Sequence, residues 1–220
     1  MKIFFDFFQI FFPTRCPYCE KIIISDRNMC NVCVEKILSK DLIRGFKIRN
    51  CNFLCLSSFL YNNRVKEAVW RYKFSGKKDY AKSFAKNLIV SFSTKFSFSD
   101  FDFVTNVPIS KKRLKERGYD QAKILAQEFS AITQIRYKDF LKKDIDNMPQ
   151  HTLNVTERKT NTRDVYSLKT SAILNGRKIL IVDDVVTSGN TFGECVFVLK
   201  KGGASFVFAL SLASARCVEV

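Results

Sequence analysis

Residues 179–191, ILIVDDVVTSGNT, are the stretch that decides the fold. Its four leading apolar residues predict a buried parallel strand, and Asp183 and Asp184 follow at the carboxyl end, where open α/β sheets place their ligands. A short turn rich in hydroxyls and glycine, residues 187–189, comes next, and a helix is expected to begin near Thr191. Backbone N–H groups at a helix N-terminus, together with hydroxyls, suit a phosphate monoester. The stretch therefore predicts an α/β domain with a phosphate site.

The two adjacent carboxylates need a physical reason. On a continuing strand Asp183 and Asp184 would point to opposite faces, and one would enter the core at high cost. We therefore expect the chain to leave the strand before them, so that both face a crevice and can bind diol hydroxyls or a hydrated Mg²⁺. Taken alone, the pair fits an Asx-rich turn that caps the next helix at least as well.

Apolar runs alternate with helical patterns after residue 58, which indicates a largely parallel sheet flanked by helices. We therefore expect two parts, an N-terminal helix and metal module over residues 1–58 and the α/β domain over residues 59–220. The expected strands are 53–61, 101–107, 135–141, 178–182 and 205–212, and the expected helices are 64–74, 80–93, 121–132 and 191–201. The polar residues 144–163 predict a long loop, a length typical of functional lids or of disorder.

Six of the eight cysteines lie within the first 55 residues. Cys16 and Cys19 form one CxxC pair, and Cys30 and Cys33 form a second, a spacing suited to tetrahedral Zn²⁺. Four thiolates leave no open position, so the site predicts a structural zinc. The remaining cysteines, Cys51, Cys55, Cys195 and Cys217, are expected to pack in the core. Cys51 and Cys55 could also form a second, incomplete site or replace one of the two pairs.

The chain is strongly basic, with 37 Lys and Arg against 21 Asp and Glu in 220 residues. This surplus favours polyanions such as nucleic acid, although a lysine-rich proteome would produce it equally well. The first twelve residues contain six Phe but are too short to span a bilayer, for which about 20 residues are needed. We expect no membrane span and a cytoplasmic location.

The most basic long stretch is residues 62–87. A helix here would turn an apolar stripe to the core and leave Trp70 on the far side, among the cations Lys66, Lys73 and Lys77. Exposed aromatic rings among cations are how sequence-tolerant proteins stack the bases of single-stranded DNA. The alternative is a solvated basic helix whose Trp covers a neighbouring domain.

Residues 179–191 closely resemble the fingerprint with which type I phosphoribosyltransferases bind phosphoribosyl pyrophosphate (PRPP). That resemblance implies that Asp183 and Asp184 contact the ribose hydroxyls. It also implies a set of residues around the 5-phosphate, namely Thr187, Ser188, Gly189, Asn190 and Thr191. Purine-salvage members carry an aspartate general base at the position of Thr187, so we assign no general base and do not expect purine salvage of that kind.

Four segments in order, residues 61–77, 106–127, 148–162 and 176–213, resemble the ComF family, which is associated with uptake of transforming DNA. The resemblance implies a pyrophosphate loop over residues 107–113. The candidate contacts in it are Pro108, Ile109, Lys111, Lys112 and Arg113.

The family's RGxNQ motif reads RGYDQ here, with Arg117 and Gln121 as site residues and Asp120 in place of Asn. A role that depends on the amide donors of that Asn is therefore in question. TERKTN resembles the family's ERxxN, which makes Arg158 a candidate lid contact.

Two functions from different classes follow. The first is a phosphoribosyltransferase in which a nitrogen nucleophile displaces pyrophosphate from C1 of Mg²⁺-bound PRPP, with the acceptor unassigned. The second is a binding module that handles single-stranded DNA, alone or with other DNA-uptake proteins, and uses PRPP as a regulatory ligand. Product analysis with labelled PRPP separates them.

Overall fold

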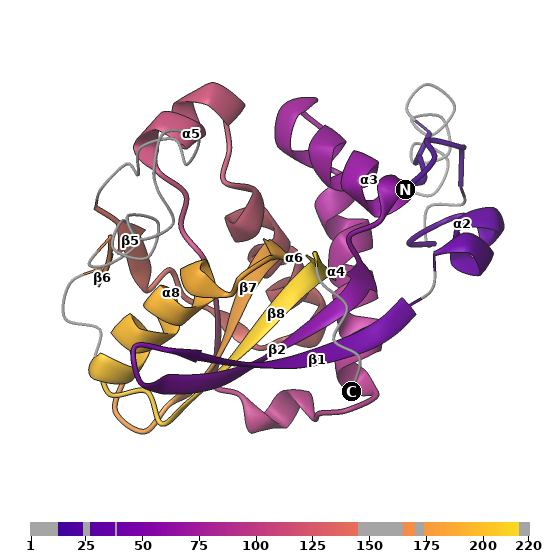
Figure 1. The fold of residues 1–220 in the computed structure, drawn as a ribbon. Helices are drawn as coiled ribbons and strands as arrows, with labels where there is room; N and C mark the ends of the chain where they lie inside the picture. Colours follow the sequence, from indigo (N-terminus) through magenta and orange to yellow (C-terminus); the bar gives the residue numbers. More distant parts are fainter. Residues whose placement is uncertain (1–12, 24–26, 38, 145–164, 170–173, 216–220) are drawn as a thin grey trace, which may run out of the picture.

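The computed structural model describes residues 13–23, 27–37, 39–144, 165–169 and 174–215. One six-stranded sheet forms the centre, in the order β1-β2-β8-β7-β3-β4 (Figure 1). Its strands are β1 (Ser39–Ile48), β2 (Cys51–Leu60), β3 (Phe103–Asn106), β4 (Arg136–Tyr137), β7 (Lys178–Val186) and β8 (Phe206–Ser214). Only the β1–β2 pair is antiparallel among these strands, so the predicted, largely parallel sheet is confirmed. A small second sheet pairs β5 (Leu141–Lys143) with β6 (Tyr166–Leu168).

Helices cover both faces of the sheet (Figure 1). The helices of the described residues are α2 (Asn31–Lys36), α3 (Asn63–Phe74), α4 (Tyr80–Ser93), α5 (Lys111–Arg117), α6 (Gln121–Thr133) and α8 (Asn190–Lys201), with the 3-10 helix η1 (Phe98–Asp100). The α4 and α6 helices belong to one hydrophobic cluster and α8 to the other. This is the α/β arrangement that the alternating pattern predicts.

The central strand β7 shows why the sheet is buried on both sides. Leu180 and Val182 pack into the cluster of α4 and α6, whereas Ile179 and Ile181 pack into the cluster of α8. All four side chains are fully buried. A parallel strand covered on both faces requires such an unbroken apolar run. The run places the two aspartates that follow it near the carboxyl end of β7.

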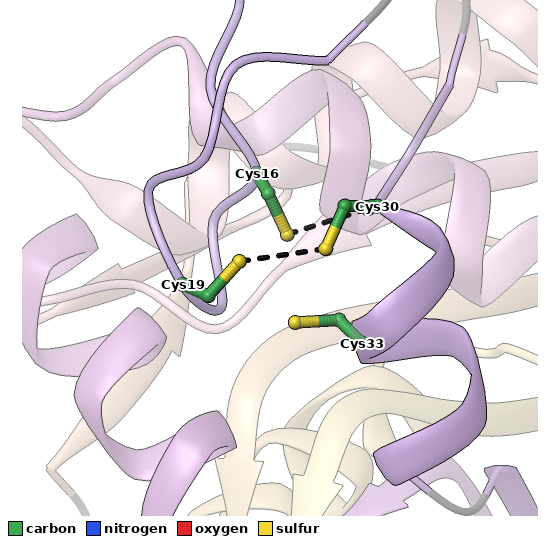
Figure 2. Close-up of side chains that lie close together, drawn as sticks. All are labelled: Cys16, Cys19, Cys30 and Cys33. Carbon is green, nitrogen blue, oxygen red and sulfur yellow. Dashed lines mark hydrogen bonds between the residues drawn. The ribbon is translucent and has the colours of Figure 1, made fainter.

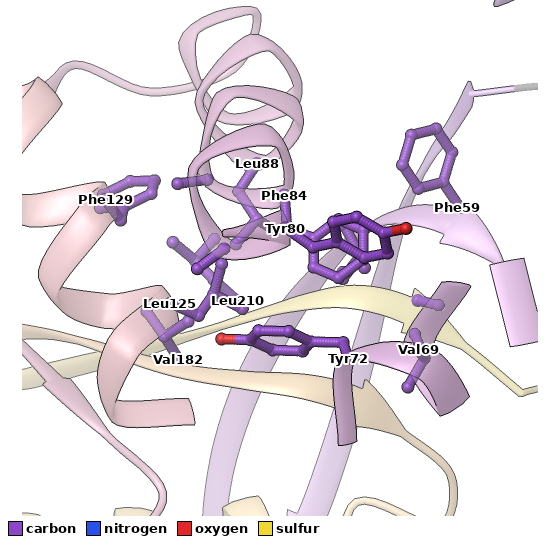
Figure 3. Close-up of a cluster of buried hydrophobic side chains, with 14 of the residues drawn as sticks. Phe59, Val69, Tyr72, Tyr80, Phe84, Leu88, Leu125, Phe129, Val182 and Leu210 are labelled. Carbon is purple, nitrogen blue, oxygen red and sulfur yellow. The ribbon is translucent and has the colours of Figure 1, made fainter. Parts of the chain in front are cut away.

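The N-terminal cysteine segment shares its core with the α/β domain, because Cys16, Tyr18 and Cys33 belong to the same buried cluster as Phe59 and Phe84, which are drawn in Figure 3. Tyr18 makes ring contacts with Phe59 at 5.7 Å and Phe84 at 5.9 Å between centroids. β2 is itself a strand of the main sheet, pairing with β8. The boundary expected at residues 58/59 therefore falls inside β2, in the region of the expected strand 53–61, and the unexpected strand β1 also joins the central sheet.

Most expected elements are present. The helices α3, α4, α6 and α8 lie where predicted to within one residue at each end. The expected strand 135–141 is instead two short strands, β4 and β5, in different sheets. β1 and α5 had no prediction, and β7 runs to Val186 instead of ending at Val182.

Some expectations lie outside the described residues: the Phe-rich start, most of the polar loop with Arg158, and Cys217. Within the described part of the chain, no helix is both long and apolar enough to cross a membrane.

Candidate functional site

The two aspartates lie on the final residues of β7, and their carboxylates do not share one crevice as expected. The strand continues past them and pairs with β8 through Asp183↔Ser211 and Val185↔Ala213. Alternation along a strand therefore sends them to opposite sides. Asp184 reaches the side of α3, where it pairs with Lys73, whereas the Asp183 charge, after burial and Cys195, raises the pKa of Tyr166 in the cluster of α8. The free-energy cost of burying these carboxylates is offset by Lys73, which pairs with Asp184, and by the backbone N–H of Asp184, which donates to Asp183.

Asp184 is 3% exposed and pairs with Lys73 of α3, with 2.8 Å between Nζ and Oδ1. Its second oxygen, Oδ2, is buried and has no hydrogen-bond partner among the described residues. Such an oxygen costs free energy unless a ligand supplies a donor or a cation. The ion pair thus leaves one ligand position on Asp184 to be filled.

Asp183 is partly buried and accepts a hydrogen bond of 2.8 Å from the backbone N–H of Asp184. Burial first, and then the neighbouring Asp184 charge, raise the pKa of Asp183 above its ordinary value, while Lys73 opposes the shift. A bound diol or cation would stabilise the ionised form of this carboxylate.

The turn after β7 leads into α8, which begins at Asn190. Gly189 precedes the helix with φ 79°, a left-handed conformation that glycine adopts without strain. Thr187 and Ser188 are exposed, and the Ser188 hydroxyl accepts a 3.5 Å hydrogen bond from the N–H of Asn190, the first residue of α8. The expected strand, hydroxyl-rich turn and helix N-terminus are therefore present, and the binding of a phosphate by this turn stays a prediction.

The expected pyrophosphate loop is shorter than residues 107–113. Lys111, Lys112 and Arg113 form the first turn of α5, and the Ser110 side chain caps that helix by accepting from the N–H of Arg113 at 3.3 Å. All three cations are exposed. The connection after β3, with Pro108 and Ile109, remains non-helical.

Arg117 ends α5 next to the carboxylates. Its guanidinium lies over the ring of Phe74 at 5.0 Å, and burial lowers the pKa of Arg117, a shift that the charges of Asp184 and Asp183 oppose. Its Nε and Nη1 atoms are buried without hydrogen-bond partners in the described part of the chain. Unsatisfied donors on Arg117 and an unsatisfied acceptor on Asp184 are complementary to a ligand that carries both anionic oxygens and hydroxyls.

Asp120 and Gln121 open α6. The Asp120 carboxylate caps the helix by accepting from the N–H of Lys123 at 2.9 Å, a role that Asn fills equally well. Burial raises the pKa of Asp120. The Gln121 carbonyl accepts a 2.7 Å hydrogen bond from the Tyr72 hydroxyl, and its side-chain Oε1 is buried without a partner in the described residues. The RGYDQ segment thus holds α5, α6 and α3 together at the edge of the site.

An open cleft of about 1190 Å³ lies between α3 and α5. Trp70 and Phe74, each 57% exposed, are 6.0 Å apart between ring centroids. Lys66 and Lys77 also line it, as do Arg113 and Arg117 from the opposite side. The expected core stripe of α3 and the exposed Trp70 are confirmed. Lys73 differs from expectation, because its ammonium is committed to Asp184.

The four cysteines of the two CxxC pairs meet in one cluster (Figure 2), and all four sulfurs lie within 4.8 Å of one another. Cys16 and Cys19 come from a loop, Cys30 precedes α2, and Cys33 lies on it. Burial raises the pKa of Cys16 and Cys33. Burial also acts on Cys30, but the N–H of Cys33 and the neighbouring sulfurs outweigh it and lower that pKa to about 7. The sulfur spacing fits a tetrahedral ion with Zn–S bonds of about 2.3 Å.

Other described cysteines pack as expected. Cys55 and Cys195 are fully buried, and the Cys55 sulfur lies 3.8 Å from the Ser211 hydroxyl. Burial raises the pKa of both thiols. Neither belongs to a metal-binding cluster of the described residues.

The cysteine cluster docks on α3. Arg71 Nη2 donates to the Pro17 carbonyl at 2.8 Å, and Arg64 Nη1 lies 3.8 Å from the Cys33 sulfur. Lys73, two residues beyond Arg71, pairs with Asp184. The helix α3 therefore contacts both the segment of the four cysteines and the carboxylate of Asp184.

Comparison with known proteins agrees with this geometry. Residues 114–219 match the phosphoribosyl transferase domain family, a range that includes β7, the turn after it and α8. With the sheet order, this match defines a protein with a type I phosphoribosyltransferase fold, joined to a four-cysteine segment consistent with a zinc module.

The chain is similar to proteins of the ComF family over most of its length. It is 28% identical over 200 residues to competence protein ComFC of Bacillus subtilis (strain 168), covering 90% of this chain and 76% of that protein. ComFC of Streptococcus pneumoniae (strain ATCC BAA-255 / R6) is also 28% identical, over 207 residues that cover 90% and 86%. DNA utilization protein YhgH of Escherichia coli (strain K12) is 31% identical over 107 residues, 48% of this chain and 46% of that protein. The chain thus aligns with about half of the length of YhgH.

Sequence reasoning missed the contribution of β1. Arg44 Nη1 donates to the Thr187 carbonyl at 3.4 Å, and Phe46 packs against Gly189. No motif marks either residue, because their role arises only when the hairpin folds over the turn before α8.

Proposed function

We propose that this protein binds PRPP together with Mg²⁺ at the carboxyl end of β7 and acts in the uptake or use of DNA. The observation that supports this proposal most strongly is the pair Asp183 and Asp184 near the end of β7, shortly before the N-terminus of α8. One buried oxygen of Asp184 lacks a hydrogen-bond partner among the described residues. The names of the relatives support the role in DNA handling.

Each part of PRPP has a chemically matched set of residues. In this proposal the ribose lies across the carboxyl end of β7, where Asp183 on one side of the strand and Asp184 on the other accept hydrogen bonds from its hydroxyls. The turn and the first N–H groups of α8 bind the 5-phosphate, with the side chains of Thr187, Ser188, Asn190 and Thr191 as further donors. Carboxylate oxygens also suit Mg²⁺, which when bound would neutralise charge on the diphosphate.

The diphosphate lies, in this proposal, between the connection after β3 and the cations of α5. Arg113 and Arg117 line the cleft on that side. Arg117 has two buried N–H donors without partners in the described residues. In transfer, the C1–O bond to pyrophosphate breaks, a C1–N bond forms, and the nucleophile loses a proton. The residues of the chain position the reactants and stabilise the departing charge, and we assign no general base.

Product analysis tests transfer. Incubating the protein with Mg²⁺, labelled PRPP and a panel of nucleobases should release pyrophosphate and a labelled nucleotide in equal amounts. Pyrophosphate release without any ribosylated product would show hydrolysis alone. Saturable PRPP binding without either product would establish the regulatory-ligand alternative.

A second function, binding of single-stranded DNA, is favoured by the cleft between α3 and α5. Two adjacent exposed aromatic rings among Lys66, Lys77 and Arg113 combine stacking surface with positive charge. Lys73 would contribute only after leaving Asp184. Fluorescence anisotropy with oligonucleotides of unrelated sequences tests this function.

A further inference from the structure

The hairpin of β1 and β2 covers the turn that precedes α8. A Cβ atom at Gly189 would lie 2.3 Å from Cδ1 of Phe46, and one at Gly193 would lie 2.4 Å from Cβ of Ile48. Real Cβ atoms essentially never approach so closely, so both glycines are needed for this contact. The turn is therefore held between the helix and the hairpin.

Arg44 is the charged residue of this contact. Its Nη1 atom donates to the Ser214 hydroxyl at 3.0 Å and lies 3.4 Å from the Thr187 carbonyl. The guanidinium also lies over the Phe46 ring, 4.7 Å from the centroid, and Phe46 stacks on Phe53 at 5.2 Å. The side chain is thereby oriented by an aromatic ring, a strand end and the turn itself.

These hydrogen bonds use one nitrogen, whereas a guanidinium carries five N–H donors and a permanent positive charge. Thr187 opens the turn assigned to the 5-phosphate. We infer that Arg44 belongs to the 5-phosphate subsite, where it fixes the Thr187 carbonyl and adds a cation for the phosphate monoester. This inference rests on the proposed function and extends it to the N-terminal hairpin, which lies outside residues 114–219 that match the transferase family.

The role predicts a selective loss. Arg44→Gln should weaken the binding of ligands that carry a 5-phosphate and leave pyrophosphate binding unchanged. A charge-assisted hydrogen bond corresponds to roughly a ten- to hundredfold change in affinity. Arg44→Lys, which keeps the charge but not the fork, should recover part of the loss. Lys47→Gln is the matched control, because it removes an exposed cation from the same strand.

Calorimetry of the full chain with Mg²⁺ would measure binding of PRPP, ribose 5-phosphate and pyrophosphate to each variant, alongside its unfolding temperature. Weaker binding of the first two ligands by Arg44→Gln alone supports the inference. Equal loss for pyrophosphate, or unchanged binding of ribose 5-phosphate, overturns it. If the wild type binds none of the three ligands, the proposed function itself fails, and that result differs from both of the others.

Discussion

The four-cysteine cluster and the two aspartates are both groups of anionic ligands, but their surroundings differ. The cysteine sulfurs face one another, and three of the four residues are buried. The Asp184 carboxylate has one oxygen paired with Lys73 and one without a partner among the described residues. The four sulfurs of the first site have the closed arrangement that suits a single ion, and the second site is left for a ligand to complete. Closure is typical of structural zinc, and an open position is typical of binding or catalysis.

The two sites are joined through α3, which touches Pro17 with Arg71 and Asp184 with Lys73. A substitution that disrupts the four-cysteine cluster should therefore also disturb the site of the two aspartates. A substitution at the aspartates should leave the cysteine cluster intact. This asymmetry can be tested by substitution.

The largest effect is expected from the closed site. Cys33→Ala should abolish zinc binding and lower the unfolding temperature by more than about 10 °C. Structural zinc contributes roughly 10–16 kcal/mol of binding free energy in zinc-finger peptides, and each kcal/mol shifts the unfolding temperature of such a chain by about 2–4 °C. Elemental analysis and calorimetry measure both quantities. Cys195→Ala should keep its metal, and a metal-free wild type of full stability would contradict the closed site.

Breaking the Lys73–Asp184 pair is expected to have the next largest effect. Lys73→Met leaves a buried carboxylate unpaired and should cost about 3 kcal/mol of unfolding free energy in urea. Lys66→Met removes an exposed cation of the same helix and should cost almost nothing. Combining Lys73→Met with Asp184→Asn should recover most of the loss. Additive losses in the double variant would show that the pair is not coupled.

The cleft beside the open site gives a smaller effect. Trp70→Ala should weaken binding of single-stranded DNA by roughly 1–3 kcal/mol and leave its salt dependence unchanged, because stacking releases no counterions. Replacing Lys66 and Lys77 should instead flatten the slope of log K against log salt by about 0.7 per lost phosphate contact. Anisotropy at several salt concentrations separates the two effects. Wild-type affinity in Trp70→Ala would make the indole structural.

The smallest effect concerns Asp120, which caps α6. Burial raises the pKa of Asp120 in the folded state, so Asp120 binds its proton more tightly there than in the unfolded chain. The free energy of unfolding therefore falls as the pH rises from the pKa of the unfolded chain to that of the folded protein. Asp120→Asn keeps a capping side chain and should match the wild type below about pH 4, the usual Asp range. At neutral pH the variant should be the more stable one in urea unfolding. A difference independent of pH would rule out ionisation as its cause.

The sequence predicted the elements with a local pattern. The apolar run of β7, the stripe of α3 and the two CxxC pairs each need neighbours only a few residues away, and each lies where expected. The expected end of β7 at residue 182 was wrong, because the expectation assumed that no partner would reach a carboxylate facing the core. Lys73 supplies that partner.

Long-range contacts account for the other differences. Arg44 and Thr187 are 143 residues apart in the chain, and no spacing rule connects them. The expected domain boundary near residue 58 was placed at a change in composition. This position lies inside β2, which pairs with β8 near the other end of the chain. Sequence periodicity reports which face of an element is buried and does not report what covers it.

Calorimetric titration of the wild type and of the Asp183→Ala, Asp184→Ala double variant with PRPP and Mg²⁺ tests the central claim most directly. We predict saturable binding at one site per chain for the wild type. The double variant should show no detectable binding while keeping its zinc, since the closed site does not depend on the open one. Equal affinity in the two proteins would contradict the assignment of the ribose site to the end of β7.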